Sequence, residues 1–288
     1  MLIRGTTRVT GVWGYPVRHS ASPAMHNAAF AHLGLDFVYV PFEVAPENIE
    51  KAVQGVRAFG LAGVNVTVPL KELVPPYLDS LTDRARQLGA VNTIVNRDGV
   101  LTGDSTDGPG FIAALAHDGF TVGPTTQAVV LGAGGSARAV VLALLEAGAQ
   151  VTVANRSLER AEALTARFAN AGTLQALPLT EDALRTALAS ANLLVNTTSV
   201  GMHPHEQQMP SVPPDALHKS LFVSDLIYNP QETRLLALAR VRGCQTQNGI
   251  EMLVRQGALA FTQWMGIPDP PLSIMRAAVR NVLQTPSA

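Results

Sequence analysis

The 288-residue sequence contains a single cysteine, Cys244. A single cysteine forms no internal disulfide, and disulfides are typical of oxidising compartments. The first residues, MLIRGTTRVTGVW, lack the long apolar run of a signal peptide. Apolar stretches such as residues 140–149 are far shorter than the roughly 20 residues of a membrane span. We therefore predict a cytoplasmic protein with no membrane partner, in which Cys244 is a small buried side chain.

The sequence also lacks an excess of charge of either sign. Lysine and arginine total 21 and aspartate and glutamate 22, which leaves a net charge of −1. Without a general positive field the chain is not expected to bind nucleic acid or an anionic membrane surface. His19 and His26 have no acidic or cysteine partner at metal-ligand spacing, so we predict no metal site.

Residues 9–95 alternate between apolar strand patterns and amphipathic helix patterns. VTGVWG, FVYVPFEV and GVNVTVP have strand character, and residues 23–33 and 46–59 have helical spacing. AVNTIVNRDGVLTGDSTD predicts two short strands joined at Arg97-Asp98-Gly99, a turn sequence. Strands that alternate with helices favour a mainly parallel sheet.

A second alternating series begins at Gln127. QAVVLG, QVTVAN, LQALPL, NLLVNTT and LFVSDLIY predict five strands of a Rossmann-like sheet. Two helices follow, at residues 249–265 and 273–283, and they add no strand to this sheet. We expect them to pack on the first domain, which assigns residues 1–108 and 252–288 to one domain and residues 109–251 to the other.

The segment VVLGAGGSARA has a strand, a glycine-rich turn and a helix-forming stretch in that order. Gly132, Gly134 and Ala137 fit the G-x-G-x-x-G/A fingerprint of dinucleotide binding, in which glycines let the backbone approach the pyrophosphate. The helix N-terminus adds partial positive charge toward the phosphates. A tight turn without a ligand is the alternative, but the flanking strand and helix favour a nucleotide.

The position about 20 residues later has no acidic residue for a ribose 2′-hydroxyl, and the chain has Asn155-Arg156-Ser157 there. Ser157 fits a helix N-cap, which makes Arg160 the third helical residue, where the helix dipole favours acids. The helix dipole disfavours positive charge at this end, so Arg156 and Arg160 are expected to face an anion, the 2′-phosphate of NADP. The alternative is that both are ordinary surface residues.

Polar residues of the first domain have both functional and ordinary structural interpretations. Ser20 and Ser22 could bind a carboxylate, although Ser22 before Pro23 could also cap a helix. Lys71 follows the strand of NVTVPLK, where α/β ligand crevices lie, but surface lysines are common there. Asn92 could form a turn and Asp107 could cap a helix.

Taken together, these motifs resemble the shikimate dehydrogenase family over residues 14–265. The resemblance includes the serine pair, NVTVPLK, AVNT, the Thr106-Asp107 turn, GAGGSARA, NRS, NTTSVGM, DLIYNP and GIEMLVRQGA. It implies two α/β domains with a cleft between them, a substrate-binding domain with a mainly parallel sheet and a Rossmann-like NADP-binding domain. The activity it implies is the reversible NADPH-dependent reduction of 3-dehydroshikimate to shikimate.

The resemblance also assigns roles to residues of this chain. Lys71 and Asp107 correspond to the catalytic dyad, in which lysine donates a proton or stabilises an oxyanion and the carboxylate orients it. The substrate carboxylate would meet Ser20, Ser22 and Tyr228, and the ring hydroxyls would meet Thr67, Asn92, Asp107 and Gln256. Cofactor contacts would fall on Gly132, Ala133, Gly134, Gly135, Ser136, Asn155, Arg156, Ser157, Arg160, Thr197, Leu226 and Gly249, although Thr197 could simply cap a strand end.

Two rival functions share this scaffold. A quinate/shikimate dehydrogenase of broader specificity is disfavoured by Arg156 and Arg160, which suit NADP, and by the serine pair Ser20 and Ser22. A non-catalytic shikimate-binding regulator is disfavoured because Lys71 and Asp107 are both present. The chain departs from the family at Ser105, where asparagine is usual, and the sequence leaves monomer and homodimer open.

Overall fold

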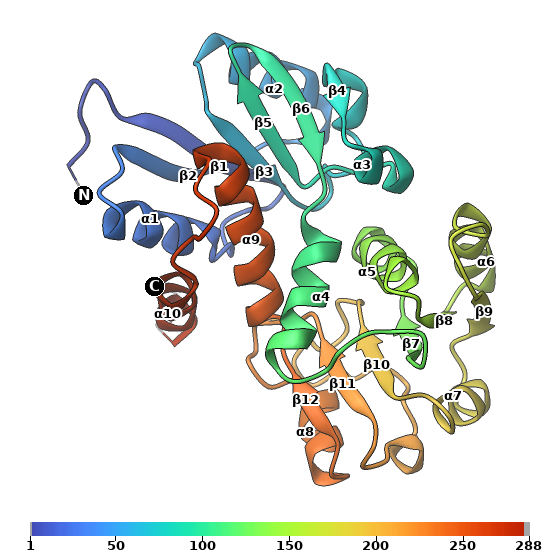
Figure 1. Cartoon of the computed structure of the whole chain (residues 1–288). Coiled ribbons are helices and arrows are strands. Elements are labelled where there is room, and N and C mark those ends of the chain that lie inside the picture. Colours follow the sequence, from blue (N-terminus) through green and yellow to red (C-terminus); the bar gives the residue numbers. More distant parts are fainter. Residues whose placement is uncertain (1, 285–288) are drawn as a thin grey trace. The chain divides into compact units, whose positions relative to one another are not determined.

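The computed structural model describes residues 2–284, which form two compact units. The first unit runs to Gly110 and resumes at Leu253, and the second comprises Phe111–Met252. Each unit is an α/β structure built on a six-stranded sheet (Figure 1).

The sheet of the first unit has the strand order β2-β1-β3-β5-β6-β4. The pairings β1–β2, β1–β3 and β4–β6 are parallel, whereas β3–β5 and β5–β6 are antiparallel, so the sheet is mixed but mainly parallel. The antiparallel hairpin turns at Asp98 and Gly99, both with positive φ, as the turn sequence predicts. The strands are β1 (Arg8–Gly14), β2 (Phe37–Glu43), β3 (Gly63–Val66), β4 (Ser80–Leu81), β5 (Thr93–Arg97) and β6 (Val100–Asp104).

Helices cover both faces of the first sheet. On one face, α2 (Ile49–Ala58) packs its buried Ile49, Val53 and Val56 against a cluster that includes Trp13 and Val64. On the other, α1 (Ser22–His32) packs against α10 (Leu272–Gln284), and α9 (Ile250–Met265) anchors to β5. The Trp264 indole makes that anchor by donating to the Ile94 carbonyl at 3.0 Å. A short helix α3 (Asp83–Leu88) precedes β5.

The second sheet is all-parallel, with the order β12-β11-β10-β7-β8-β9. The order reverses between β7 and β10, and ligands of doubly wound sheets bind at the carboxyl ends of strands beside such a reversal. The strands are β7 (Gln127–Leu131), β8 (Gln150–Asn155), β9 (Leu174–Pro178), β10 (Leu193–Asn196), β11 (Phe222–Asp225) and β12 (Gln245–Gln247), and the helices are α4 (Asp107–His117), α5 (Gly135–Glu146), α6 (Leu158–Arg167), α7 (Glu181–Leu188) and α8 (Arg234–Val241).

The structure corrects two details of the predicted elements. The Rossmann-like sheet has six strands rather than five, because β12 is a short QTQ segment with no apolar pattern. The strand of GVNVTVP ends at Val66, since the Leu70 amide donates to the Thr67 carbonyl at 2.9 Å and turns the chain. Cys244 is buried, as predicted.

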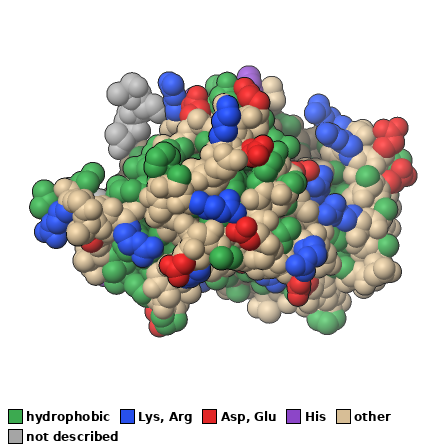
Figure 2. Space-filling model, turned by 90° about the horizontal axis from the view of Figure 1, so that it is seen from above, with side chains coloured by type: hydrophobic (Ala, Val, Ile, Leu, Met, Phe, Trp, Pro, Cys, Tyr) green, Lys and Arg blue, Asp and Glu red, His purple; other side chains and the backbone are tan. Residues whose placement is uncertain are grey.

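Within residues 2–284 no helix is both long and apolar enough to cross a membrane. On the face drawn in Figure 2, basic and acidic side chains are interspersed, and neither sign gathers into one large patch.

Candidate active site

Lys71 and Asp107 form an ion pair in the first unit. The Lys71 Nζ donates to Asp107 Oδ2 at 2.6 Å, and the side chains are 19% and 10% exposed. Lys71 lies in the turn that follows β3, and Asp107 is the first residue of α4. The Asp107 carboxylate therefore bonds to side chains rather than serving only as a helix cap.

Asn92 holds the second oxygen of this carboxylate. Its Nδ2 donates to Asp107 Oδ1 at 2.8 Å and to Thr106 Oγ1 at 2.9 Å, and it lies 3.3 Å from Gln256 Oε1. Its Oδ1 accepts from the Thr106 amide at 2.8 Å, which fixes the orientation of the Asn92 side-chain amide. Four predicted site residues thus come together: Lys71, Asn92, Asp107 and Gln256.

The serine pair lies in the turn between β1 and α1. The helix begins at Ser22, and its N-cap position is Ala21, which makes no side-chain capping bond. The Ser22 amide instead donates to Ser20 Oγ at 3.3 Å. Ser22 is buried, Ser20 and Thr67 are partly buried, and the capping interpretation of Ser22 therefore has no support in the structure.

The glycine loop of the second unit is shaped by close approach of the backbone. Gly132 has φ +106°, and a Cβ there would lie 2.7 Å from Thr197 Oγ1. Gly134 is the exposed N-cap of α5, and a Cβ on it would meet nothing within 4 Å. Open space at Gly134 and a crowded Gly132 fit a turn that presents backbone amides to a ligand. Ala133, Gly135 and Ser136 complete this turn and the start of the helix.

The segment after β8 carries two exposed arginines. Ser157 is the N-cap of α6, and its Oγ accepts from the Arg160 amide at 3.3 Å. Asn155 Nδ2 donates to the Ser157 carbonyl at 2.9 Å, which closes the turn. Among residues 2–284 neither Arg156 nor Arg160 has an acidic partner, so both guanidinium groups remain available to an anion.

The remaining predicted contacts lie just beyond β10, β11 and β12. Thr197 Oγ1 donates to the Leu131 carbonyl at 2.6 Å, so its hydroxyl joins the ends of β10 and β7. A Cβ on Gly249 would clash with the Leu226 carbonyl, and the Gly249 amide donates to the Ile227 carbonyl at 3.0 Å. Tyr228 directly follows Ile227, and burial raises the pKa of its phenol. The described residues contain no cluster of three or more metal-ligating side chains.

Family models match three segments of the chain. They are described as the shikimate dehydrogenase substrate binding domain (residues 12–94), shikimate/quinate 5-dehydrogenase (residues 114–232) and the shikimate 5′-dehydrogenase C-terminal domain (residues 249–280). A shikimate dehydrogenase (NADP⁺) of Symbiobacterium thermophilum is 50% identical over 286 residues, which cover 98% of this chain and 96% of that one. The chain belongs to the shikimate dehydrogenase family.

Solved structures of shikimate dehydrogenases have the same fold. One determined with NADP⁺ has a TM-score of 0.92 at 38% identity, covering 99% of this chain and 98% of that one. Another, from Thermus thermophilus with NADP(H) and shikimate, has a TM-score of 0.86 at 41% identity and covers 95% and 99%. The resemblance read from the motifs and the predicted two-sheet α/β fold are thereby confirmed.

Ser105 is the departure from the usual shikimate dehydrogenase turn, and the structure accommodates it. Ser105 is buried, and its amide donates to Asp104 Oδ1 at 2.8 Å. Asp104 Oδ1 also accepts from Thr82 Oγ1 at 2.6 Å. The turn before Asp107 is therefore held by Asp104, and the substitution leaves the carboxylate of Asp107 in its bonds to Lys71 and Asn92.

A buried polar group that the motif analysis left without a role lies beneath the cofactor-side loops. Asp225, at the end of β11, accepts from Asn196 Nδ2 at 3.0 Å, from the Ile227 amide at 3.1 Å and from Thr233 Oγ1 at 2.7 Å. Burial raises the pKa of Asp225 to about 6 despite these donors. In the sequence, the acidic residue that ends the apolar strand FVSD is the feature from which this network could have been predicted.

The raised pKa of Asp225 makes stability depend on pH. The unfolded chain releases this proton near 3.8 and the folded chain near 6, so the folded state binds more protons in between. The stability contributed by this group is therefore full below pH 3.8 and is lost as the pH rises through 6. We expect the free energy of unfolding of the wild type, minus that of Asp225→Asn, to fall by about 2 kcal/mol across this window in urea titrations. A difference that stays constant with pH would contradict the assignment.

Ser22→Ala separates substrate binding from helix capping. We expect a raised KM for shikimate with a smaller change in kcat, because a carboxylate contact is remote from the reacting carbonyl. Since Ser22 makes no capping bond, the melting temperature should hardly change. Steady-state kinetics and thermal unfolding measured together check this, and a lower melting temperature with an unchanged KM would favour the structural role.

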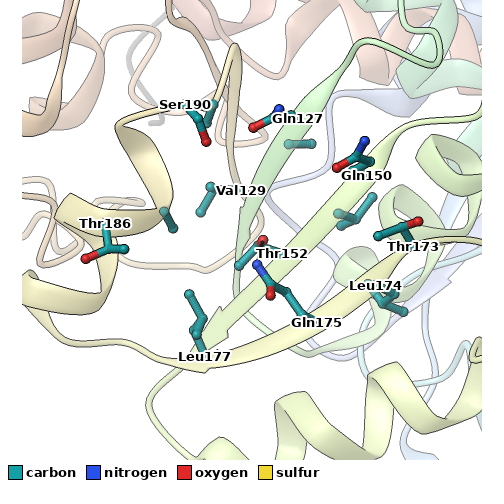
Figure 3. Close-up of a pocket in the computed structure, with 14 residues that line it drawn as sticks. Gln127, Val129, Gln150, Thr152, Thr173, Leu174, Gln175, Leu177, Thr186 and Ser190 are labelled. Carbon is teal, nitrogen blue, oxygen red and sulfur yellow. Dashed lines mark hydrogen bonds between the residues drawn. The ribbon is translucent and has the colours of Figure 1, made fainter.

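A hollow of about 510 Å³ lies away from the predicted contacts (Figure 3). It is bordered by side chains of β7, β8 and β9, among them Gln127, Gln150 and Gln175, and by Thr186 of α7. The described residues that line it carry no charge, and none of them is a predicted site residue. This hollow offers no acid–base group for a reaction.

Proposed function

We propose that the chain catalyses the reversible reduction of 3-dehydroshikimate to shikimate with NADPH, as an enzyme of aromatic amino acid biosynthesis. The observation that carries the proposal is the Lys71–Asp107 pair, 2.6 Å apart and backed by Asn92, in a member of the shikimate dehydrogenase family. A regulator that only binds shikimate has no need of a buried acid–base pair.

We assign the contacts with the substrate carboxylate to Ser20, Ser22 and Tyr228. The hydroxyls of Ser20 and Ser22 would donate to the carboxylate of the substrate without neutralising it. Thr67 has a partly exposed side chain beyond β3, where it is available to a ring hydroxyl. Further ring-hydroxyl contacts are assigned to Asn92, Asp107 and Gln256.

The proton of the reaction is assigned to Lys71. In reduction the ketone carbon gains a hydride and its oxygen gains a proton, which converts C=O into CH–OH; oxidation of shikimate reverses both transfers. The Lys71 ammonium donates that proton to the oxygen, or stabilises the developing negative charge on it. Asp107 accepts a hydrogen bond from the Lys71 ammonium, which orients it, and Asn92 fixes the opposite oxygen of Asp107.

The second unit fits a dinucleotide with a 2′-phosphate. Gly132 has no room for a Cβ and Gly134 faces open space, so the turn can bring backbone amides to a pyrophosphate. Arg156 and Arg160 would bind the 2′-phosphate, and Thr197, Leu226 and Gly249 would border the nicotinamide side. NADPH, when bound, supplies the hydride.

The cellular setting follows from composition and chemistry. We infer a cytoplasmic protein that works as a monomer or homodimer, with small-molecule substrates and no nucleic-acid or membrane partner. The single buried Cys244 suits a reducing compartment. Light scattering on the purified chain measures the mass directly and decides between the monomer and the homodimer.

The decisive assay follows the absorbance of NADPH when purified protein is mixed with shikimate and NADP⁺. We expect NADPH to form together with a product that is lighter than shikimate by two hydrogen atoms. The reverse assay, with 3-dehydroshikimate and NADPH, should consume the cofactor. Saturable binding of shikimate with no turnover in either direction would instead support the non-catalytic regulator.

A further inference from the structure

The phenol of Tyr39 lies in a dry position that no reaction step uses. Tyr39 is on β2 and is 1% exposed. The ring of His26 stacks on it with a centroid distance of 4.3 Å, and Trp264 lies 6.0 Å away. His26 is fully buried, and burial lowers its pKa to about 3, so the stacked ring is neutral. An aromatic ring packed among other rings in this way keeps its hydroxyl at one place.

The phenol has a fixed hydrogen-bond direction. Tyr39 Oη donates to Asn65 Oδ1 at 2.8 Å. The Asn65 Nδ2 donates to the Asn92 carbonyl at 3.2 Å, and that carbonyl can only accept. The Asn65 amide therefore has one orientation, with its oxygen toward Tyr39, and the single phenolic proton is committed to that oxygen.

From Asn65 the hydrogen bonds continue to the dyad. Asn65 Nδ2 also donates to Thr93 Oγ1 at 3.1 Å, and Thr93 Oγ1 donates to Asn92 Oδ1 at 2.9 Å. The opposite end of the Asn92 amide donates to Asp107 Oδ1, whose partner oxygen holds Lys71. Asn65, Thr93 and Asn92 are all buried, so water does not replace a bond that is lost.

We propose that Tyr39 is a positioning residue, which orients Asp107 and Lys71 through Asn65, Thr93 and Asn92. The inference rests on the proposed function, in which Ser22 and the Lys71–Asp107 pair serve opposite parts of one substrate. Tyr39 itself touches no reacting atom.

Tyr39→Phe tests this, because it removes one oxygen and keeps the ring. We expect kcat for shikimate oxidation to fall roughly 5- to 50-fold, the scale of a buried acceptor left unpaired at Asn65. The KM for shikimate should stay nearly the same, since Tyr39 is assigned no contact with the substrate. This pattern is opposite to that of Ser22→Ala, and a purely structural role would not produce it.

Two further variants act as controls. Phe30→Leu makes a cavity in the same aromatic cluster and alters no polar group, so it should lower the melting temperature but leave kcat near that of the wild type. The double variant Tyr39→Phe/Asn65→Ala should be no slower than Asn65→Ala alone, because the phenol acts through Asn65. Multiplied losses in the double variant, a raised KM in Tyr39→Phe, or an unchanged kcat in a folded Tyr39→Phe protein would each overturn the proposal.

A readout that needs no turnover separates this proposal from the proposed function. An amine-directed acylating reagent labels lysine side chains that can leave their hydrogen-bond partners, and peptide mass spectrometry reports the rate at Lys71. Labelling of Lys71 should be faster in Tyr39→Phe than in the wild type, with exposed Lys51 unchanged, because Asp107 holds the ammonium less firmly. A wild type without activity on shikimate would refute the function alone, whereas equal labelling rates would refute the positioning role.

Discussion

Lys71→Met should lower kcat by about 10²- to 10⁴-fold, the usual range for a lost acid–base group. Methionine keeps much of the bulk of lysine and has no proton to donate. The affinity for NADP should be nearly unchanged, because Lys71 belongs to the first unit and the assigned cofactor contacts to the second. Steady-state and cofactor-binding measurements check both parts.

A matching loss of kcat is expected when Asp107, the partner of Lys71, is changed. Asp107→Asn should cause a similar loss, and the double variant should lose far less than the product of the two single losses, because the pair acts as a unit. Lys51→Met, at an exposed position of α2, is the matched control and should behave as the wild type. Near-normal kcat in a folded Lys71→Met enzyme would show that the lysine is an ordinary surface residue.

Arg156→Ala should raise the KM for NADP by roughly 10- to 150-fold and that for NAD far less. The expected loss of about 1.5–3 kcal/mol is that of a charge-assisted hydrogen bond to a 2′-phosphate, which NAD lacks. Arg156 is exposed and has no acidic partner among residues 2–284, so its replacement breaks no internal ion pair.

Lys219→Ala removes the same charge from another exposed position of the second unit and serves as the control for Arg156→Ala. It should leave both cofactor constants within about twofold, since surface charges at a distance are screened by salt. Equal losses with NADP and NAD in Arg156→Ala would mean that the arginine does not bind the 2′-phosphate.

The sequence predicted the fold well where local patterns were strong. The alternation of apolar strands and helices gave both sheets, and the Asp98-Gly99 turn gave the hairpin of β5 and β6. The sequence patterns did not predict β12, because the residues QTQ have no apolar periodicity and form a strand only by pairing with β11. Strand limits set by a tertiary turn, as at Val66, are likewise invisible to a local pattern.

The candidate site was predictable as a set of motifs but its internal connections were not. Lys71 and Asp107 lie 36 residues apart, and only the folded first unit brings their side chains together. The role of Tyr39 depends on strand register: Tyr39 pairs with Thr10 and Thr10 with Gly63, which places the phenol on the same face as Asn65 two residues later. Such a contact across an intervening strand needs the assembled sheet.

Comparing kcat/KM for the four combinations of shikimate or quinate with NADP or NAD tests the choice of substrate and cofactor in one experiment. We expect shikimate with NADP to be the best pair, because Ser20 and Ser22 suit the shikimate carboxylate and Arg156 and Arg160 suit a 2′-phosphate. Quinate with NAD as the best pair, or no turnover with shikimate and NADP, would contradict it.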